Sequence, residues 1–174
     1  MTAGKTETAP GATGATGASA GAPATWADLE AAEPELAARG QALLTARGWG
    51  SGLLATVRDG VPPRIHPMSV AIVEGHLLTV VLGGSAKARD VTADGRYALH
   101  AHQDAGKPDE FQVRGHARIV DAGDFRDRVV AHWHFEVGDE DLVVELGVEH
   151  ALLGERPDAG TWPPVYRSWH APGG

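Results

Sequence analysis

The sequence predicts a mainly β (α+β) fold: a small antiparallel barrel decorated by helices. Between residues 52 and 82, short runs rich in Val, Ile and Leu alternate with the turn signals "RDG" and "EGH", a spacing typical of β-hairpins. Two further strand-like runs follow, "GRYALHAHQ" and "DEFQVRGHARIVD". Five or six short strands with helices inserted late favour a small barrel with peripheral helices over a βαβ sheet.

The first structured segment, "TWADLEAAEPELAARGQALLTARG", predicts helical structure up to Arg47. Thr25 is suited to the N-cap position, with Asp28 three residues later. Pro34 is suited to the first turn of a second helix. Gly48 then predicts the helix end.

Three antiparallel strands are expected next, near residues 52–58, 63–73 and 76–82. Pro67 lies within the second run and predicts a bulge or an edge there, because proline cannot donate to a strand ladder. A short helix is expected from Ser85 to Ala93. In the run at 109–121, apolar and polar residues alternate, which predicts one apolar face and one polar, basic face.

The segment 121–158 predicts two amphipathic helices divided at Gly138, and "WPPVYRSWHAP" predicts a last short strand. The segment holds eleven Asp and Glu against three Arg, so it accounts for the whole formal net charge of −8. The chain therefore lacks the basic face of a nucleic-acid-binding protein. We expect the acidity on solvated helices, which leaves Lys87 and the arginines elsewhere to form a local positive site.

Length and composition predict one domain, residues 25–174, in a chain of 174 residues with 43% apolar content. Residues 1–24 consist almost entirely of small residues and predict a disordered low-complexity tail. This tail has neither the basic start nor the apolar stretch of a signal peptide, and no run is long enough for a membrane span. With no cysteine in the sequence, a cytoplasmic location is expected.

The stretch "LGGSAKARDV" has the composition of an anion site. If Ser85 and Ala86 begin a helix, the unpaired first-turn amides and the helix dipole favour a negative charge there. Lys87 adds a mobile positive charge, and Gly83 and Gly84 permit close backbone approach. The alternative is an ordinary N-cap beside a solvent-exposed lysine.

A second candidate is "PPRIHPM", in which Arg64 and His66 share one strand face. Arg64 is suited to a phosphate and His66 to a hydrogen bond with a heteroaromatic ring. The alternative is that Arg64 is an exposed strand residue.

Nine histidines raise the question of a metal, but none is expected. His100 and His102 share a strand face, with His116 on a neighbouring strand, yet no third ligand stands at a recognisable spacing. His132 and His134 are two apart in an expected helix and therefore diverge. The serines lack the sequence context of a nucleophile elbow, so the sequence does not favour a hydrolase.

Taken in order, "ATVRDGVPPRIHPMSVAIVEGHLLTVVLGGSAKARDVTADGRYALHAH" and "EFQVRGHARIVD" resemble the pyridoxamine 5'-phosphate oxidase-like superfamily of FMN-binding split barrels. The likeness covers about residues 50–121. It implies a six-stranded antiparallel split β-barrel with peripheral helices, a homodimer, and FMN bound at the subunit interface.

The resemblance also implies site residues. Ser85, Ala86 and Lys87 would hold the flavin phosphate, and the backbone of Val80 and Val81 would face the ring. Gln112 would contact the flavin from the adjacent strand or subunit, and Trp169 or Trp162 is a candidate for stacking on a ring. The strand that would line the phosphate and ribityl chain comprises Arg64, Ile65, His66, Pro67, Met68 and Ser69.

The function implied is an FMN-dependent oxidoreductase acting on an unknown small substrate. The chain ends "RSWHAPGG", without the Arg-Leu-x-Pro segment of oxidases that make pyridoxal phosphate. Two alternatives stay open. One is a deazaflavin-dependent reductase, for which Arg58 and Arg89 would line the groove; the other is a non-enzymatic flavin- or haem-binding protein, for which His100 and His102 are candidates. No catalytic residue is identified.

Overall fold

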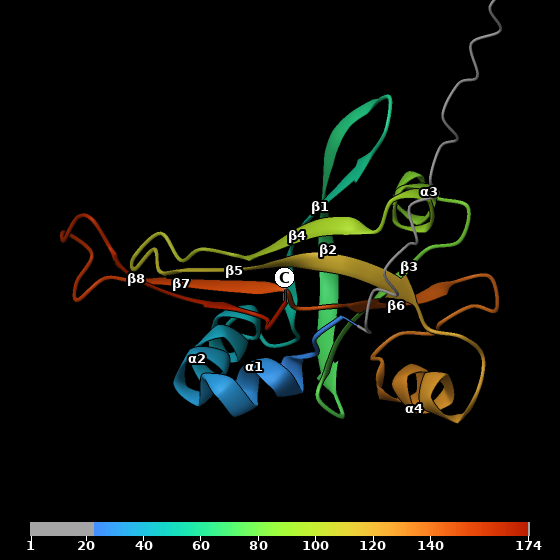
Figure 1. Cartoon of the computed structure of the whole chain (residues 1–174), viewed down its shortest axis with the longest axis horizontal. Coiled ribbons are helices and arrows are strands. Elements are labelled where there is room, and N and C mark those ends of the chain that lie inside the picture. Colours follow the sequence, from blue (N-terminus) through green and yellow to red (C-terminus); the bar gives the residue numbers. More distant parts are fainter. Residues whose placement is uncertain (1–22, 174) are drawn as a thin grey trace, which may run out of the picture.

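The computed structural model of this chain describes residues 23–173. In this range one antiparallel sheet has the strand order β4-β1-β2-β3-β6-β5-β7-β8, and a further pairing of β4 with β5 closes six strands into a barrel (Figure 1). The predicted fold class is thereby confirmed. The strands are β1 (Ser51–Arg58), β2 (Val61–Val73), β3 (His76–Val81), β4 (Arg96–Ala101), β5 (Glu110–Ile119), β6 (Leu142–Leu146), β7 (His150–Glu155) and β8 (Val165–His170).

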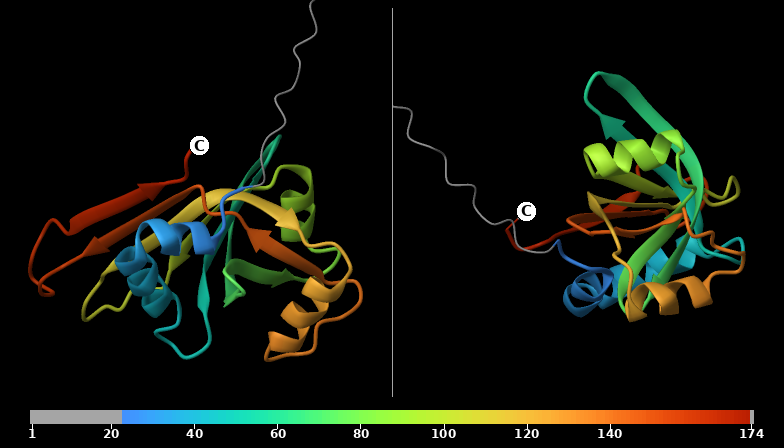
Figure 2. Two further views of the ribbon diagram at one scale, coloured as in Figure 1. Left: turned by 60° about the horizontal axis from the view of Figure 1, so that its bottom comes forward. Right: turned by 90° about the vertical axis from the view of Figure 1, so that its right-hand side faces the viewer.

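Four helices surround this sheet in the described range: α1 (Trp26–Ala32), α2 (Pro34–Leu44), α3 (Ala86–Ala93) and α4 (Asp124–His132). Thr25 forms a capping box with Asp28 at the start of α1, and Pro34 opens α2, both as predicted. Strands β7 and β8, with the loop that joins them, extend beyond the barrel as a two-stranded wing (Figure 2).

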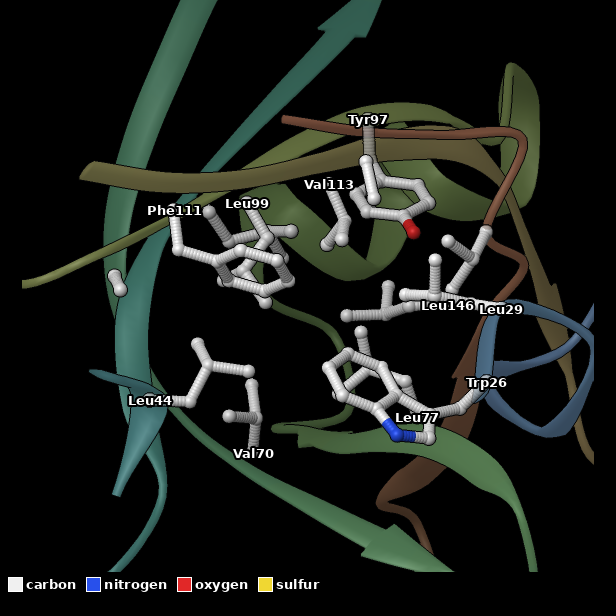
Figure 3. Packing of buried hydrophobic residues seen from close by; sticks show 14 of the residues in the cluster. Trp26, Leu29, Leu44, Val70, Leu77, Tyr97, Leu99, Phe111, Val113 and Leu146 are labelled. Carbon is white, nitrogen blue, oxygen red and sulfur yellow. The ribbon is translucent and has the colours of Figure 1, made fainter. Parts of the chain in front are cut away.

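Helices α1 and α2 pack against the barrel core. Trp26 meets the Phe111 ring edge-on, with ring centroids 6.0 Å apart, and Figure 3 shows both rings among the buried aliphatic side chains. Gly40 of α2 lies directly against the Phe111 ring, where a Cβ would overlap the ring atoms. The close approach of α2 therefore depends on glycine at this position.

A second apolar cluster covers the outer side of β2, β3 and β6 under α4. Val129 and Trp133 from the helix segment pack there with Leu78, Val80 and Val143. Strand β6 is consequently buried on both faces, with Val143 in this cluster and Val144 in the barrel core.

The prediction for residues 121–158 was wrong after Gly138. One helix, α4, forms as expected, but the residues beyond Gly138 form β6 and β7 instead of a second helix. The run "LVVEL" is short, apolar and buried on both sides, and such a run shows no periodicity that separates a strand from a helix. Nor is all of its acidity solvated: Glu145 is 1% exposed and pairs with His76 and Arg118.

The remaining elements lie close to their predicted positions. Around Pro67, β2 pairs with β1 through Leu53, while its pairing with β3 begins at Val70. Pro67 therefore occupies an edge stretch of β2, one of the two expected outcomes. Residues 1–22 of the predicted tail lie outside the described residues. The last two tail residues, Pro23 and Ala24, lie against the barrel, where the Val148 amide donates to the Ala24 carbonyl at 2.7 Å.

None of the helices within residues 23–173 combines the length and the apolar character needed to cross a membrane.

Candidate functional site

Helix α3 stands beside the β1–β2 hairpin at one end of the barrel (Figure 1). Ser85 caps it, with its Oγ accepting from the Ala88 amide at 3.2 Å. Within residues 23–173, the amides of Ala86 and Lys87 have no protein acceptor, as expected for a first helical turn. The predicted short helix is thus confirmed, and its start presents two unpaired donors.

The loop that leads into α3 is closely fixed. Gly83 donates its amide to Asp141 Oδ1 at 3.1 Å and lies so near the Glu140 carbonyl that a Cβ would overlap it. Gly84 has a φ of +69°, a conformation that favours glycine. Arg89 Nη1 donates to the Gly84 carbonyl at 2.6 Å. Gly83 and Gly84 therefore form a defined turn that leads into α3.

Asp90 ties α3 to the hairpin, and sequence analysis missed it. Its carboxylate has no exposed surface and accepts from Arg64 Nη1 at 2.7 and 2.9 Å and from Thr56 Oγ1 at 3.1 Å. Arg58 Nε lies 3.2 Å away as an ion pair without hydrogen-bond geometry. Burial alone would raise the Asp90 pKa, but the hydrogen bonds from Arg64 and Thr56 and the two arginine charges lower it overall.

Arg64 and His66 point to the same side of β2, as their spacing predicts. His66 Nε2 is buried and has no hydrogen-bond partner in the described part of the chain. Burial lowers the His66 pKa, the charges of Lys87 and Arg64 lower it further, and Asp90 opposes them.

Lys87 is half-buried and makes no ion pair with any residue of 23–173. Asp90 pairs with two cations, Arg58 and Arg64. Lys87 and Arg89 are then the cations of α3 that pair with no carboxylate within residues 23–173, and Arg89 already donates to the Gly84 carbonyl. We call Arg64, His66, Ser85, Lys87 and Asp90, with the amides of Ala86 and Lys87, the α3 cradle.

The other residues of the predicted strand lie around this cradle in different ways. Ile65 and Pro67 are exposed on the opposite side of β2, with Ile65 70% exposed, whereas Met68 is buried in the core. The Ser69 carbonyl accepts from Thr79 Oγ1 at 2.8 Å. Val80 and Val81 bury their side chains in the two apolar clusters, so only their backbone is available to a ligand.

Gln112 and Trp169 do not join the cradle within one chain. Gln112 pairs with His100 on β4, His100 pairs with Leu53 on β1, and Leu53 pairs with Pro67 on β2. Gln112 therefore lies on the side of the sheet that carries Pro67. This is the side opposite to Arg64 and His66. Trp169 pairs with Ala151 and is 9% exposed within the barrel core, the position of a structural aromatic.

The residues considered for the alternatives are also placed. Arg58 and Arg89 are the deazaflavin candidates. Arg58 forms an ion pair with Asp90, and Arg89, which belongs to α3, donates to the Gly84 carbonyl. His100 Nδ1 lies 2.6 Å from the Ala101 carbonyl, and His100 and His102 are both half-buried. Within residues 23–173, no three His, Cys, Asp or Glu side chains gather as a metal site.

Comparison with known proteins gives a match at the level of structure. No protein-family model matches the sequence, and no curated protein matches it. A putative pyridoxamine 5'-phosphate oxidase from Listeria innocua superposes with a TM-score of 0.55 at 16% identity, covering 67% of this chain and 96% of that one.

Two haem proteins share the architecture as well. A haem-binding protein from Mycobacterium smegmatis matches with a TM-score of 0.55 at 16% identity over 75% of this chain and 57% of its own. The haem storage protein from Vibrio cholerae matches with a TM-score of 0.54 at 14% identity over 67% and 89%. At these identities the likeness establishes the shared split-barrel fold.

Proposed function

We propose that this protein is an FMN-dependent oxidoreductase of the pyridoxamine 5'-phosphate oxidase-like type, acting on a small substrate. The observation that carries the proposal is that Lys87, which makes no ion pair within residues 23–173, follows the Ser85-capped start of α3, the helix that Arg64 reaches through Asp90. A helix start and an unpaired ammonium group together suit a phosphate monoester. FMN ends in that group.

The cradle residues then have separate tasks. Lys87 and the amides of Ala86 and Lys87 bind the phosphate, and the Ser85 hydroxyl can donate to it while still capping the helix. Arg64 is held in place by Asp90 and presents its remaining N–H groups beside the cradle. His66 Nε2, buried and without a partner in the described residues, is placed to hydrogen-bond the cofactor.

The bound flavin would supply hydride transfer, and the protein would supply orientation and the local electrostatic field. This division of labour accounts for the absence of a recognisable acid–base pair in the sequence. The substrate and the electron donor stay unassigned.

Gln112 fits the proposal only if a second copy of the chain contributes it, because within one chain it lies on the other side of the sheet from His66. The proposed homodimer therefore completes the cofactor site with Gln112 from the partner. Ile65 and Leu53, which are 70% and 38% exposed on the Gln112 side, provide apolar surface for that contact.

The test is an absorbance spectrum of the purified protein followed by titration with FMN and with the deazaflavin coenzyme. A flavin spectrum as purified, or saturable uptake of FMN with NAD(P)H-dependent turnover, supports the proposal. A colourless protein that takes up no FMN overturns it. Tighter binding of the deazaflavin coenzyme favours the reductase alternative, in which Arg58 and Arg89 would receive the longer anionic tail.

Haem binding is the second candidate, favoured by the fold shared with two haem proteins and by His100 on the exposed side of β4. Titration with haemin tests it. A Soret band that is lost in His100→Ala, but kept in the exposed-histidine control His134→Ala, supports haem binding through β4. An unchanged Soret band in His100→Ala excludes His100 as the residue that binds the haem.

A further inference from the structure

A hollow of about 330 Å³ lies on the outward side of β4, β5, β7 and β8, away from the α3 cradle. Strand pairing brings its main side chains into register: Arg114 stands beside His150, and His150 beside His170. The next row along β4 and β5 holds Arg96 and His116. We call this feature the β-wing hollow.

Two of its basic side chains already contact acids. Arg96 donates to both oxygens of Asp94 at 2.5 Å, and His116 Nδ1 lies 2.7 Å from Glu149 Oε1. Arg114 differs, because its guanidinium is exposed and has no acceptor within residues 23–173. The lining thus keeps one unopposed, rigid fork of N–H donors.

His150 supplies an independent sign of a missing ligand. Its Nδ1 is buried and has no hydrogen-bond partner in the described part of the chain. Buried polar atoms normally have a partner, so an orphaned nitrogen in a hollow needs an explanation. The His150 ring also stands 4.3 Å from the His170 ring, centroid to centroid, and the two form an aromatic wall.

We propose that the β-wing hollow binds a small organic anion, with Arg114 holding its carboxylate or phosphate and His150 and His170 contacting its planar body. The volume suits a small molecule. The lining carries two guanidinium groups against one carboxylate, Glu149, which is turned to His116. This inference does not rest on the proposed flavin site.

The electrostatics of the hollow provide a sensitive reporter. Burial lowers the His150 pKa, and the charges of Arg114 and His170 lower it further. Arg96, Tyr97, His116 and Glu149 complete the titratable groups that line the hollow. An anion bound beside Arg114 would favour the protonated imidazole, so its binding should raise the His150 pKa.

The experiment follows the imidazole NMR signals of the full-length protein while phenyl phosphate, benzoate or inorganic phosphate is added. The background is Lys87→Ala, because phosphate is also expected to occupy the α3 cradle. We expect saturable shifts of the His150 and His170 signals. Arg114→Gln should weaken this binding roughly tenfold, the loss of about one charge-assisted hydrogen bond, and Arg114→Lys should recover part of it.

The exposed Arg47→Gln variant serves as the matched control and should bind as the parent does. Equal affinity in Arg114→Gln, or shifts confined to histidines outside the hollow, would overturn the proposal. Shifts with benzoate and phenyl phosphate but not with inorganic phosphate support the aromatic wall. Failure of the parent protein, with Lys87 present, to bind FMN would contradict the proposed function, and saturable His150 shifts would leave this inference standing.

Discussion

Asp90 determines how the positive charges around the start of α3 are shared. It is fully buried, yet Arg64 Nη1 and Thr56 Oγ1 make three hydrogen bonds to its two oxygens, and Arg58 adds an ion pair. Buried carboxylates persist when they are paired in this way. With both arginines so engaged, Lys87 is the cradle residue whose removal should affect an anionic ligand most.

Replacing Lys87 by alanine should weaken FMN binding by about 1.5–3 kcal/mol, the range for a charge-assisted hydrogen bond. The fold should survive, because the side chain is half-buried and pairs with no described residue. Titration calorimetry of the wild type and the variant measures the difference. Lys107→Ala is the control, since Lys107 pairs with Asp109 away from α3. Equal FMN affinity in Lys87→Ala would place the phosphate elsewhere.

Asp90→Asn should destabilise the protein by about 1–3 kcal/mol at pH 7, because Arg58 and Arg64 lose their shared carboxylate. The folded-state pKa of Asp90 is lowered, so its contribution is complete above the unfolded-state pKa of about 3.9 and is lost as the pH falls through the folded-state value. Urea unfolding at pH 7 and pH 3 should show the difference between wild type and variant shrinking in acid. Asp59→Asn, at a fully exposed side chain, should leave the free energy of unfolding unchanged at both pH values. A difference independent of pH would contradict this role.

At the scale of elements, the parts that sequence predicts well are those set by neighbours in the chain. The turn signals fix the β1–β2 and β2–β3 hairpins, and Ser85 caps α3 through an amide three residues away. Strand β6 was missed because its burial comes from α4 and the barrel interior, neither of which is local. Asp90 was missed for the same reason: its partners lie 26 and 34 residues away in the chain.

The packing of α2 on the barrel is a further long-range feature that sequence alone does not reveal. Gly40→Ala should reduce stability by up to about 2 kcal/mol, even though alanine is the better helix former by about 1 kcal/mol. The added methyl group meets the Phe111 ring, and overpacking a core costs about 1–3 kcal/mol. Urea unfolding measures the change. Gln41→Ala, at the adjacent exposed position, is the control. A more stable Gly40→Ala variant would mean that helix propensity outweighs this contact.

At the scale of the whole molecule, the two sides of the sheet are covered unequally. The barrel interior and the outer side of β2, β3 and β6 are packed with apolar side chains, whereas the outward side of β1, β2, β4, β5, β7 and β8 is partly exposed. We call this the open face. Leu53, Ile65 and Pro67 lie at one end of it, and the β-wing hollow lies at the other. An apolar end beside a polar end is the pattern of an interface core with a wetter rim.

If a second copy covers the apolar end of the open face, Ile65→Glu should convert the dimer to a monomer. Ile65 is 70% exposed, so a charge there costs the free chain little, but burying that charge against a partner is expensive. Light scattering after size-exclusion chromatography measures the mass. Val165→Glu is the matched control, because Val165 is 64% exposed but alternates to the other side of β8.

The monomeric variant should also bind FMN more weakly, since it loses the partner's Gln112. A dimer that withstands Ile65→Glu would place the interface elsewhere, and a monomer with undiminished FMN affinity would remove Gln112 from the site.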